Sequence, residues 1–219
     1  MYAAISADIV SSSSLSKDSM LELRERLEQC LSLLGKYYHG FWGRIIRGDS
    51  IECILDHPED AFEIAIILKT WVKAFEPKDP RNLKYFNRYG LRLAIGIDNM
   101  KTVDRYLDIM NGEAIYRSGR TLDGLIGHAK YSFTISMADC KHEEALQVIF
   151  SLVNHLLNNA TARQCETIHE RILAANASQT AEKLGISVSG VNQTLNAVGW
   201  NAIEQSILYY RRILKDYVW

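Results

Sequence analysis

Short apolar segments alternate with amphipathic ones over residues 1–140, and this alternation limits the possible folds more than any other feature of the chain. Segments 2–10, 41–47, 50–55, 91–97 and 131–136 are rich in apolar and β-branched residues and predict strands. Apolar residues at helical spacing predict helices over 16–38, 59–75 and 112–125. The order strand, helix, hairpin, helix, strand, helix, strand predicts an α/β layer with a mixed sheet of about five strands.

The remainder of the chain carries helical patterns only. A strongly apolar helix is expected over 143–157, where Asn158-Asn159 interrupts it. Further helices are expected over 166–175, after a cap at Ser178, after Ser187 or Ser189, and over 202–217. We therefore predict two domains, 1–158 and 159–219.

Composition limits the classes of partner. The chain has 25 Lys+Arg against 26 Asp+Glu, so nucleic-acid binding would have to rest on a local surface. No apolar run approaches the ~18 residues of a membrane span, and the first apolar segment contains Asp8 and lacks a basic leader. A cytoplasmic protein is expected. Four cysteines without a CxxC pair predict buried, reduced thiols rather than a zinc site.

A helix, a short turn with Gly185 and a second helix are expected over 179–195. Gly185 ends the first of these helices, and Ile186 fills the turn. The segment resembles the helix-turn-helix of bacterial regulators. That resemblance implies that the second helix lies in the major groove of DNA. The side chains expected to face the DNA are Ser189, Asn192, Gln193 and Asn196. Asn and Gln are suited to bidentate contacts with adenine.

The charge of this segment leaves an alternative open. From Ala160 onward there are six basic and five acidic residues, which is weak for a surface that must neutralise phosphates. The helices could instead pack against a protein or form a dimer seam, and a homodimer would double any DNA-binding charge.

Two aspartates stand where loops leave the predicted strands. Asp8 is near the end of the first strand, and Asp49 lies in the hairpin turn Gly48-Asp49. If the first strand lies beside the hairpin, the two carboxylates meet at one end of the sheet. Carboxylate oxygens are ligands that Mg²⁺ prefers, so the pair is a candidate metal site. The alternative is a capping residue and an ordinary turn residue.

These motifs resemble the catalytic domain of class III nucleotide cyclases. The resemblance comprises Asp8-Ile9-Val10, Gly48-Asp49 and the segment from Asn111 to Arg120. It implies a ferredoxin-like, palm domain in which Asp8 and Asp49 bind Mg²⁺ or Mn²⁺. It also implies that Arg120 stabilises the transition-state phosphate across a homodimer interface. With the run Arg47–Ser50, most of the chain resembles the SatD family, which combines such a domain with a C-terminal helix-turn-helix.

The departures from the cyclase pattern decide between functions. Ile45 stands where cyclases have a purine-reading Lys, Tyr116 where they have an Asn, and Ile109 where they have a base-reading Asp. The loss of one such donor typically costs ~10²–10³ in rate. The pattern therefore favours binding of a nucleotide or another phosphorylated ligand over cyclisation. The further residues expected to bind phosphate are Arg44, Arg47 and Ser11.

Three hypotheses follow from the sequence. The first is a DNA-binding regulatory protein whose palm domain binds a metal and a phosphorylated ligand. The second is a divergent nucleotidyl cyclase, a metal-dependent phosphorus–oxygen lyase. The third is an interaction module without catalysis.

Overall fold

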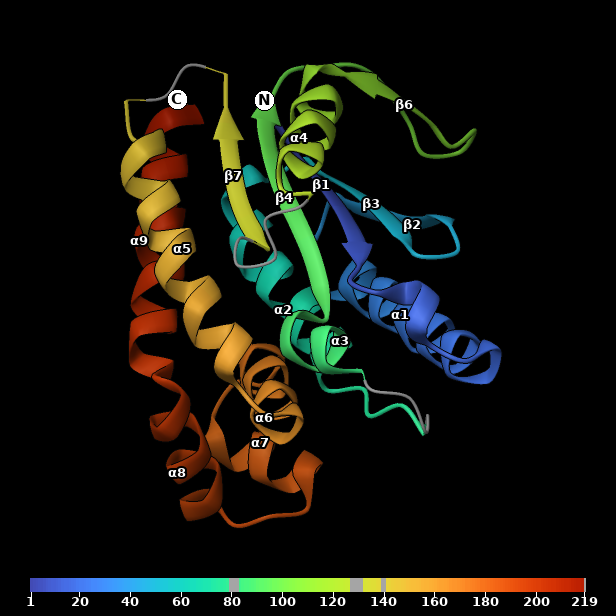
Figure 1. Cartoon of the computed structure of the whole chain (residues 1–219). Helices are drawn as coiled ribbons and strands as arrows, with labels where there is room; N and C mark the ends of the chain where they lie inside the picture. Colours follow the sequence, from blue (N-terminus) through green and yellow to red (C-terminus); the bar gives the residue numbers. More distant parts are fainter. Residues whose placement is uncertain (79–82, 127–131, 139–140, 219) are drawn as a thin grey trace.

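The computed structural model describes residues 1–78, 83–126, 132–138 and 141–218 (Figure 1). Its centre is a five-stranded sheet in the order β2-β3-β1-β4-β7. The strands are β1 (Tyr2–Ile9), β2 (Phe41–Arg47), β3 (Ser50–Leu55), β4 (Leu91–Asp98) and β7 (Phe133–Met137). β1 pairs antiparallel with β3 and β4, whereas β4 and β7 are parallel. The predicted mixed α/β sheet is confirmed.

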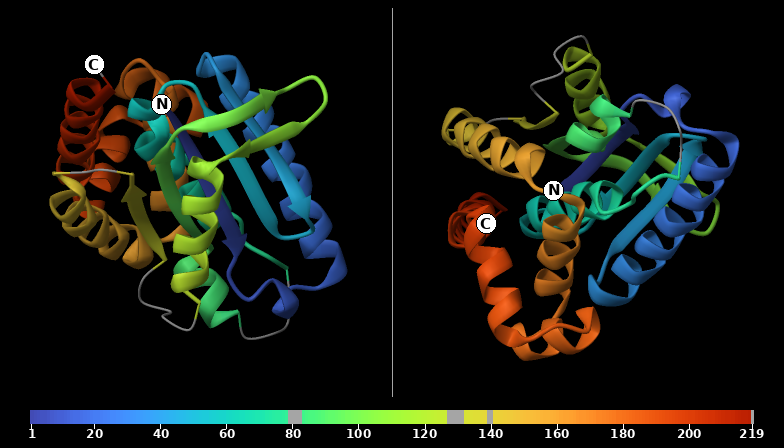
Figure 2. Two further views of the ribbon diagram at one scale, coloured as in Figure 1. Left: turned by 90° about the horizontal axis from the view of Figure 1, so that it is seen from above. Right: turned by 60° about the horizontal axis from the view of Figure 1, so that its bottom comes forward.

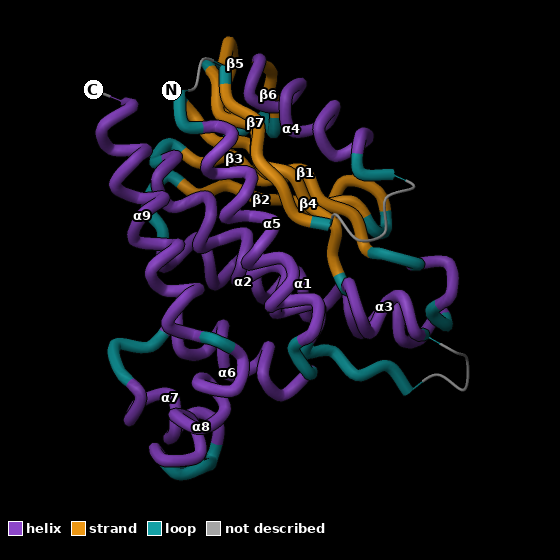
Figure 3. The backbone as a smooth tube through the Cα atoms, turned by 60° about the vertical axis from the view of Figure 1, so that its left-hand side comes forward, coloured by secondary structure: helices purple, strands orange, loops and turns teal. Residues whose placement is uncertain are grey.

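The first four strands follow the β-α-β-β-α-β order of a ferredoxin-like sheet, in which each helix crossover leaves a gap for another strand. α1 (Lys17–Tyr37) and α2 (Ala61–Lys73) supply the crossovers, and their apolar sides share one core with the odd-numbered residues of β1. α4 (Glu113–Gly124) packs on the opposite face of the sheet, as Figure 3 shows.

α4 lies unusually close to the sheet because β4 has a glycine beneath it. A Cβ on Gly96 would come within 2.4 Å of the Ala114 carbonyl oxygen and 2.5 Å of the Ser118 nitrogen. Both are backbone atoms of α4, so a side chain there would push the whole helix outward. The contact is completed by a hydrogen bond of 2.8 Å between the Ser6 and Ser118 hydroxyls.

Two regions of the α/β part differ from the sequence prediction. The sequence analysis assigns no helix or strand to segment 76–90, but this segment contains α3 (Lys84–Tyr89). The hairpin of β5 (Met100–Asp104) and β6 (Ile109–Gly112) was not predicted, and it projects beyond the main sheet in Figure 2. Two short 3-10 helices, η1 (Ser12–Ser14) and η2 (Pro58–Asp60), complete this part.

In the described part of the chain, five helices follow β7. They are α5 (Glu143–Asn159), α6 (Ala162–Leu173), α7 (Ala177–Leu184), α8 (Val188–Val198) and α9 (Trp200–Val218). α6 begins four residues earlier than expected because Thr161 and Gln164 form a capping box. Asn176, rather than Ser178, caps α7. Ser187 caps α8, one of the two positions expected.

The main core continues from the sheet into these helices. Cys165 and Ile168 of α6 and Ile207 of α9 belong to the same cluster as the interior of the sheet. Ala181 of α7 forms a small separate cluster with Val191 and Leu195 of α8, whereas Val198 of α8 belongs to the main core. α7 and α8 lie at the end of the molecule away from the sheet (Figures 1 and 3). The division at residue 158 stays a prediction.

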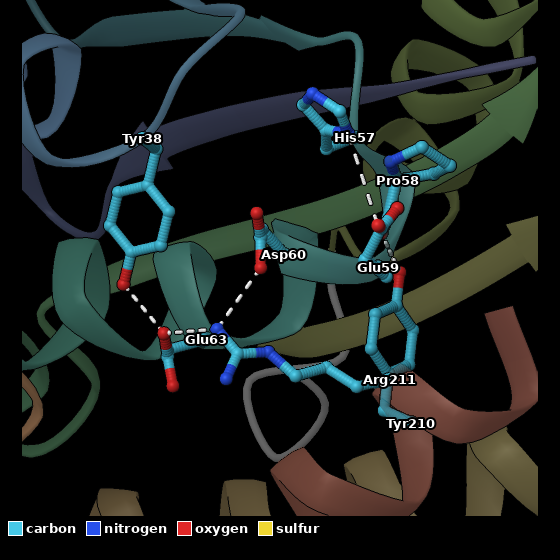
Figure 4. Close-up of polar contacts among 8 residues, drawn as sticks. All are labelled: Tyr38, His57, Pro58, Glu59, Asp60, Glu63, Tyr210 and Arg211. Carbon is cyan, nitrogen blue, oxygen red and sulfur yellow. Dashed lines mark hydrogen bonds and ion pairs between the residues drawn. The ribbon is translucent and has the colours of Figure 1, made fainter. Parts of the chain in front are cut away.

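Polar contacts fix α9 to the α/β part (Figure 4). The Tyr210 hydroxyl donates to the Pro58 carbonyl oxygen at 2.9 Å. Arg211 lies 3.0 Å from Asp60 and 2.7 Å from Glu63. We call Tyr210, Arg211 and their partners the α9 latch.

The buried thiols agree with the sequence prediction. Cys30, Cys53 and Cys165 are buried and unpaired, and burial raises the pKa of each thiol. Cys140 lies outside the described residues. No helix in the described ranges is both long enough and apolar enough to span a bilayer.

The close approach of α4 gives a first prediction. Gly96→Ala should lower the free energy of unfolding by about 1–3 kcal/mol because the added Cβ overpacks a backbone contact. Gly119 lies on α4, and a Cβ there would meet no neighbouring atom within 4 Å. Gly119→Ala should therefore raise the free energy of unfolding by about 0.5–1 kcal/mol. Urea unfolding followed by circular dichroism measures both. Equal effects of the two substitutions would contradict the proposed role of Gly96.

His169 of α6 gives a second prediction. Its ring packs on Trp71 with 4.7 Å between centroids, and burial, with the charges of Arg26 and Lys183, lowers its pKa to about 3. An unfolded histidine protonates near pH 6.5, whereas the folded one stays neutral to a much lower pH. The free energy of unfolding therefore falls as the pH is lowered below 6.5. Between pH 7.5 and 5.0 it should remove about 2 kcal/mol from the free energy of unfolding.

His169→Phe keeps the ring contact without the titration, so the variant should lose about 2 kcal/mol less than the wild type over this range. Urea unfolding at the two pH values measures the difference. The same pH dependence in both proteins would show that His169 is not the group responsible.

Candidate functional site

The sheet face that α4 only partly covers carries a row of charged and hydroxyl side chains. Side chains alternate along each strand, so Ser6 and Asp8 of β1 lie on the face opposite the core. The antiparallel registers then place Glu52 opposite Ser6 and Arg44 opposite Glu52. In the same way Arg92 of β4 lies opposite Asp8. Residues 84 positions apart in the chain therefore meet on this face.

Asp8 is held by an arginine that the sequence analysis did not single out. Arg92 Nε donates to Asp8 Oδ1 at 3.0 Å, and Arg92 Nη2 donates to Asp8 Oδ2 at 2.8 Å. The two side chains are 20% and 25% exposed. A fork of two parallel hydrogen bonds is the strongest arrangement of an arginine and a carboxylate. Both oxygens of Asp8 thus face a fixed cation.

Asp49 reaches the same end of the sheet. Its carbonyl oxygen accepts a hydrogen bond of 3.0 Å from the Ile9 nitrogen, at the end of β1. Its carboxylate accepts a hydrogen bond of 2.6 Å from the Ser12 hydroxyl. Ser11 precedes this contact in a left-handed conformation, with φ of 56°, and leads the chain into η1. The structure therefore places Asp8, Ser11 and Asp49 at the same end of the sheet.

These contacts bear on the expected metal site. Within the described part of the chain, no group of three or more His, Cys, Asp or Glu side chains could hold a metal ion. A cation at Asp8 would have to share or displace the fork of Arg92. The residues present thus fit an internal ion pair better than an open Mg²⁺ or Mn²⁺ site. The metal site stays a prediction.

The expected phosphate-binding arginines are placed differently from one another. Arg44 is engaged: its Nη2 lies 3.1 Å from Glu52, its Nη1 donates to the Asp108 carbonyl oxygen at 3.2 Å, and its guanidinium lies over the Trp42 ring. Only its Nε lacks a partner among the described residues. The side chain of Arg47 lies outside what the structure describes.

Arg120 of α4 is exposed and contacts no acidic group in the described ranges. The arginine of α4 that does reach the sheet is Arg117, which binds Asp98 at 2.8 Å and 3.1 Å. Tyr116, at the position of the missing asparagine, donates its hydroxyl to Asn111 at 3.0 Å. The sheet face therefore carries three arginine–carboxylate pairs and one free arginine at its margin, as far as the chain is described.

The second group of expected site residues lies on α8. Gly185 adopts φ of 63° and ends α7, and the Ile186 nitrogen donates to the Ala181 carbonyl oxygen. The turn is followed at once by the Ser187 cap of α8. Four side chains of α8 are exposed and make no hydrogen bond or ion pair within the described chain: Ser189, Asn192, Gln193 and Asn196.

The charges around α8 are largely paired. α8 itself contains no charged residue. Nearby basic side chains face acidic ones: Lys183 lies 2.6 Å from Glu170, and Arg171 lies 3.8 Å from Glu204. Arg163 likewise pairs with Glu166. Among the described basic residues after Ala160, Arg212 and Lys215 have no acidic partner.

Comparison with known proteins identifies no family. No protein-family model matches the chain, and no curated protein matches it. Among solved structures, that of a bacterial light-regulated adenylyl cyclase is similar to 62% of this chain and 74% of the other, with 13% sequence identity and a TM-score of 0.39. The resemblance to the SatD family therefore rests on the sequence motifs alone.

The arginine fork gives a third prediction, tested by a double-mutant cycle. Asp8→Ala, Arg92→Ala and the double variant should show a coupling energy of about 1–2 kcal/mol, because each single variant leaves a half-buried charge without its partner. Urea unfolding measures all three free energies. Additive effects would show that the fork contributes nothing to stability.

The Arg92→Ala variant also tests the predicted metal site. If Asp8 and Asp49 can share a cation, 1 mM Mn²⁺ should raise the melting temperature of Arg92→Ala but leave the wild type unchanged. Asp49→Ala in the Arg92→Ala background should abolish the increase. Equal increases in all three proteins would point to a Mn²⁺ site elsewhere.

Proposed function

We propose that the chain is a DNA-binding regulatory protein in which α8 contacts base edges and the α/β sheet holds the helical segment in place. One observation carries the proposal. The exposed side of α8 presents four hydrogen-bonding side chains that no described residue satisfies. Exposed amides without protein partners are groups suited to a polar ligand with fixed donors and acceptors, such as a base edge.

The shape of α8 supports the proposal. With 11 residues it is about 16 Å long, a length that fits into a major groove. Its inner side is fixed by Val191 and Leu195, which pack on Ala181 of α7. This packing determines which residues face outward. Ser189, Asn192, Gln193 and Asn196 follow the i, i+3, i+4, i+7 spacing of one helix face.

The sheet face supports catalysis less well than it supports a structural role. Two of the groups expected to bind metal or phosphate, Asp8 and Arg44, are engaged by Arg92 and Glu52. A nucleotide or another phosphorylated ligand stays part of the proposal, and Arg120 would be its first contact because that side chain is exposed and unpaired within the described chain. No reaction is derived from this arrangement.

The ion pairs near α8 determine the affinity for DNA that we expect and its salt dependence. Few basic side chains are free to neutralise phosphates, so one copy should bind DNA with modest affinity and shallow salt dependence. A homodimer would place two copies of α8 on two half-sites and raise the affinity without a more basic surface.

A further prediction tests DNA binding. The full chain should retain duplexes from a random-sequence pool, and Asn192→Ala with Gln193→Ala should weaken binding to the selected duplex at least tenfold. Each lost base contact costs about 1–3 kcal/mol, and tenfold corresponds to about 1.4 kcal/mol. Fluorescence anisotropy at 50 mM salt measures the affinity.

Asn201→Ala is the matched control, because Asn201 is an exposed asparagine on α9 rather than α8. This variant should bind as tightly as the wild type. Failure of the wild-type chain to retain any duplex, or an equal loss in Asn201→Ala, would overturn the proposal.

A further inference from the structure

We infer that α8 reads A·T base pairs and contacts the methyl group of thymine; this inference rests on the proposed function and names the DNA sequence class that it would recognise. The residue types on the outer side of α8 carry it. Arginine and lysine are suited to guanine O6 and N7, and acidic side chains to cytosine N4. α8 contains none of these residues.

The amides of α8 have the complementary preference. An asparagine or glutamine side chain has a donor and an acceptor side by side, and it can bind adenine N6 and N7 at once. Asn192, Gln193 and Asn196 are exposed, and their amides are not engaged within the described chain. All three can therefore turn toward an adenine without breaking a contact of the protein.

Val188 adds an apolar contact at the start of the helix. It is 41% exposed, although it is a large apolar residue, and it lies one position after the Ser187 cap. In helix-turn-helix proteins the first residues of the second helix reach the base edges. The thymine C5-methyl is the apolar group of the major groove, and a valine is suited to it. Val188 and Asn192 are four residues apart, so they lie on one helix face.

Because the basic side chains near α8 are paired with acidic ones, the preference for A·T base pairs should have a large effect on affinity. A protein bound mainly through phosphates tolerates many sequences, because the backbone is the same everywhere. Here Lys183 and Arg163 already face Glu170 and Glu166. Base contacts must therefore supply a larger share of the affinity, and exchanging an A·T pair for a G·C pair should cost more of it.

The test uses the duplex that the full chain selects from a random pool. Replacing the contacted adenine by 7-deazaadenine removes the N7 acceptor and keeps the base pair, so wild-type affinity should fall about tenfold. The Asn192→Ala, Gln193→Ala variant should lose nothing further. Replacing the contacted thymine by deoxyuridine should weaken the wild type about threefold and Val188→Ala by a smaller factor, because alanine keeps only its Cβ to contact the methyl. Asn201→Ala should respond to both analogues as the wild type does.

The outcomes separate the two proposals. Enrichment of A·T pairs with these paired losses supports the inference. A selected duplex that is rich in G·C pairs, or one that is insensitive to both analogues, overturns the inference but leaves DNA binding intact. If no duplex is selected, the proposed function and the inference both fail.

Discussion

The α9 latch is the constraint on which the arrangement of the molecule depends. The Tyr210 hydroxyl and the Arg211 guanidinium bind η2 and the start of α2, so the last helix is fixed to the α/β part over 148 positions of sequence or more. Burial alone would lower the pKa of Arg211, but Glu63 and Asp60 raise it, so the side chain stays charged. Removing one member would strand the others in a partly buried position, which is costly. Together with α6, which packs on α2 in the main core, the latch therefore holds α7 and α8 in place.

Internal ion pairs also stabilise the face of the sheet. Asp8, Glu52 and Asp98 each face an arginine, and these arginines come from β4, β2 and α4. A carboxylate that already accepts two hydrogen bonds from a guanidinium has little free energy to gain from a second cation, whereas an unsatisfied carboxylate would have much. At Asp8, where a metal site was expected, the Arg92 guanidinium thus stabilises the sheet instead. Within the described chain, the free hydrogen-bonding side chains include the four on the exposed side of α8.

The sequence predicts what is local and misses what depends on register. The helix at Lys17 follows from the Ser16 cap, and the β2–β3 hairpin follows from Gly48-Asp49 between two β-prone runs. Arg92 has no such signal. It is the only charged residue between Leu91 and Ile97, but nothing local shows that β4 pairs with β1 so that it meets Asp8. α3 and the β5–β6 hairpin were missed because a polar segment with two prolines and a short exposed hairpin lack the apolar periodicity that marks an element.

A helix that reads bases without adding charge places particular demands on the rest of the protein. Nonspecific attraction to phosphates normally brings a protein to DNA and holds it there while the bases are read. With α8 uncharged and its basic neighbours paired, that attraction is small for one copy of the chain. Arg212 and Lys215 follow the latch residues on α9. They are the described basic residues of this segment that have no acidic partner. Two copies on one duplex would double both the free charge and the number of base contacts, and the binding free energies of the two half-sites would add. If α8 binds DNA as proposed, two chains on one duplex would therefore bind more tightly than one chain.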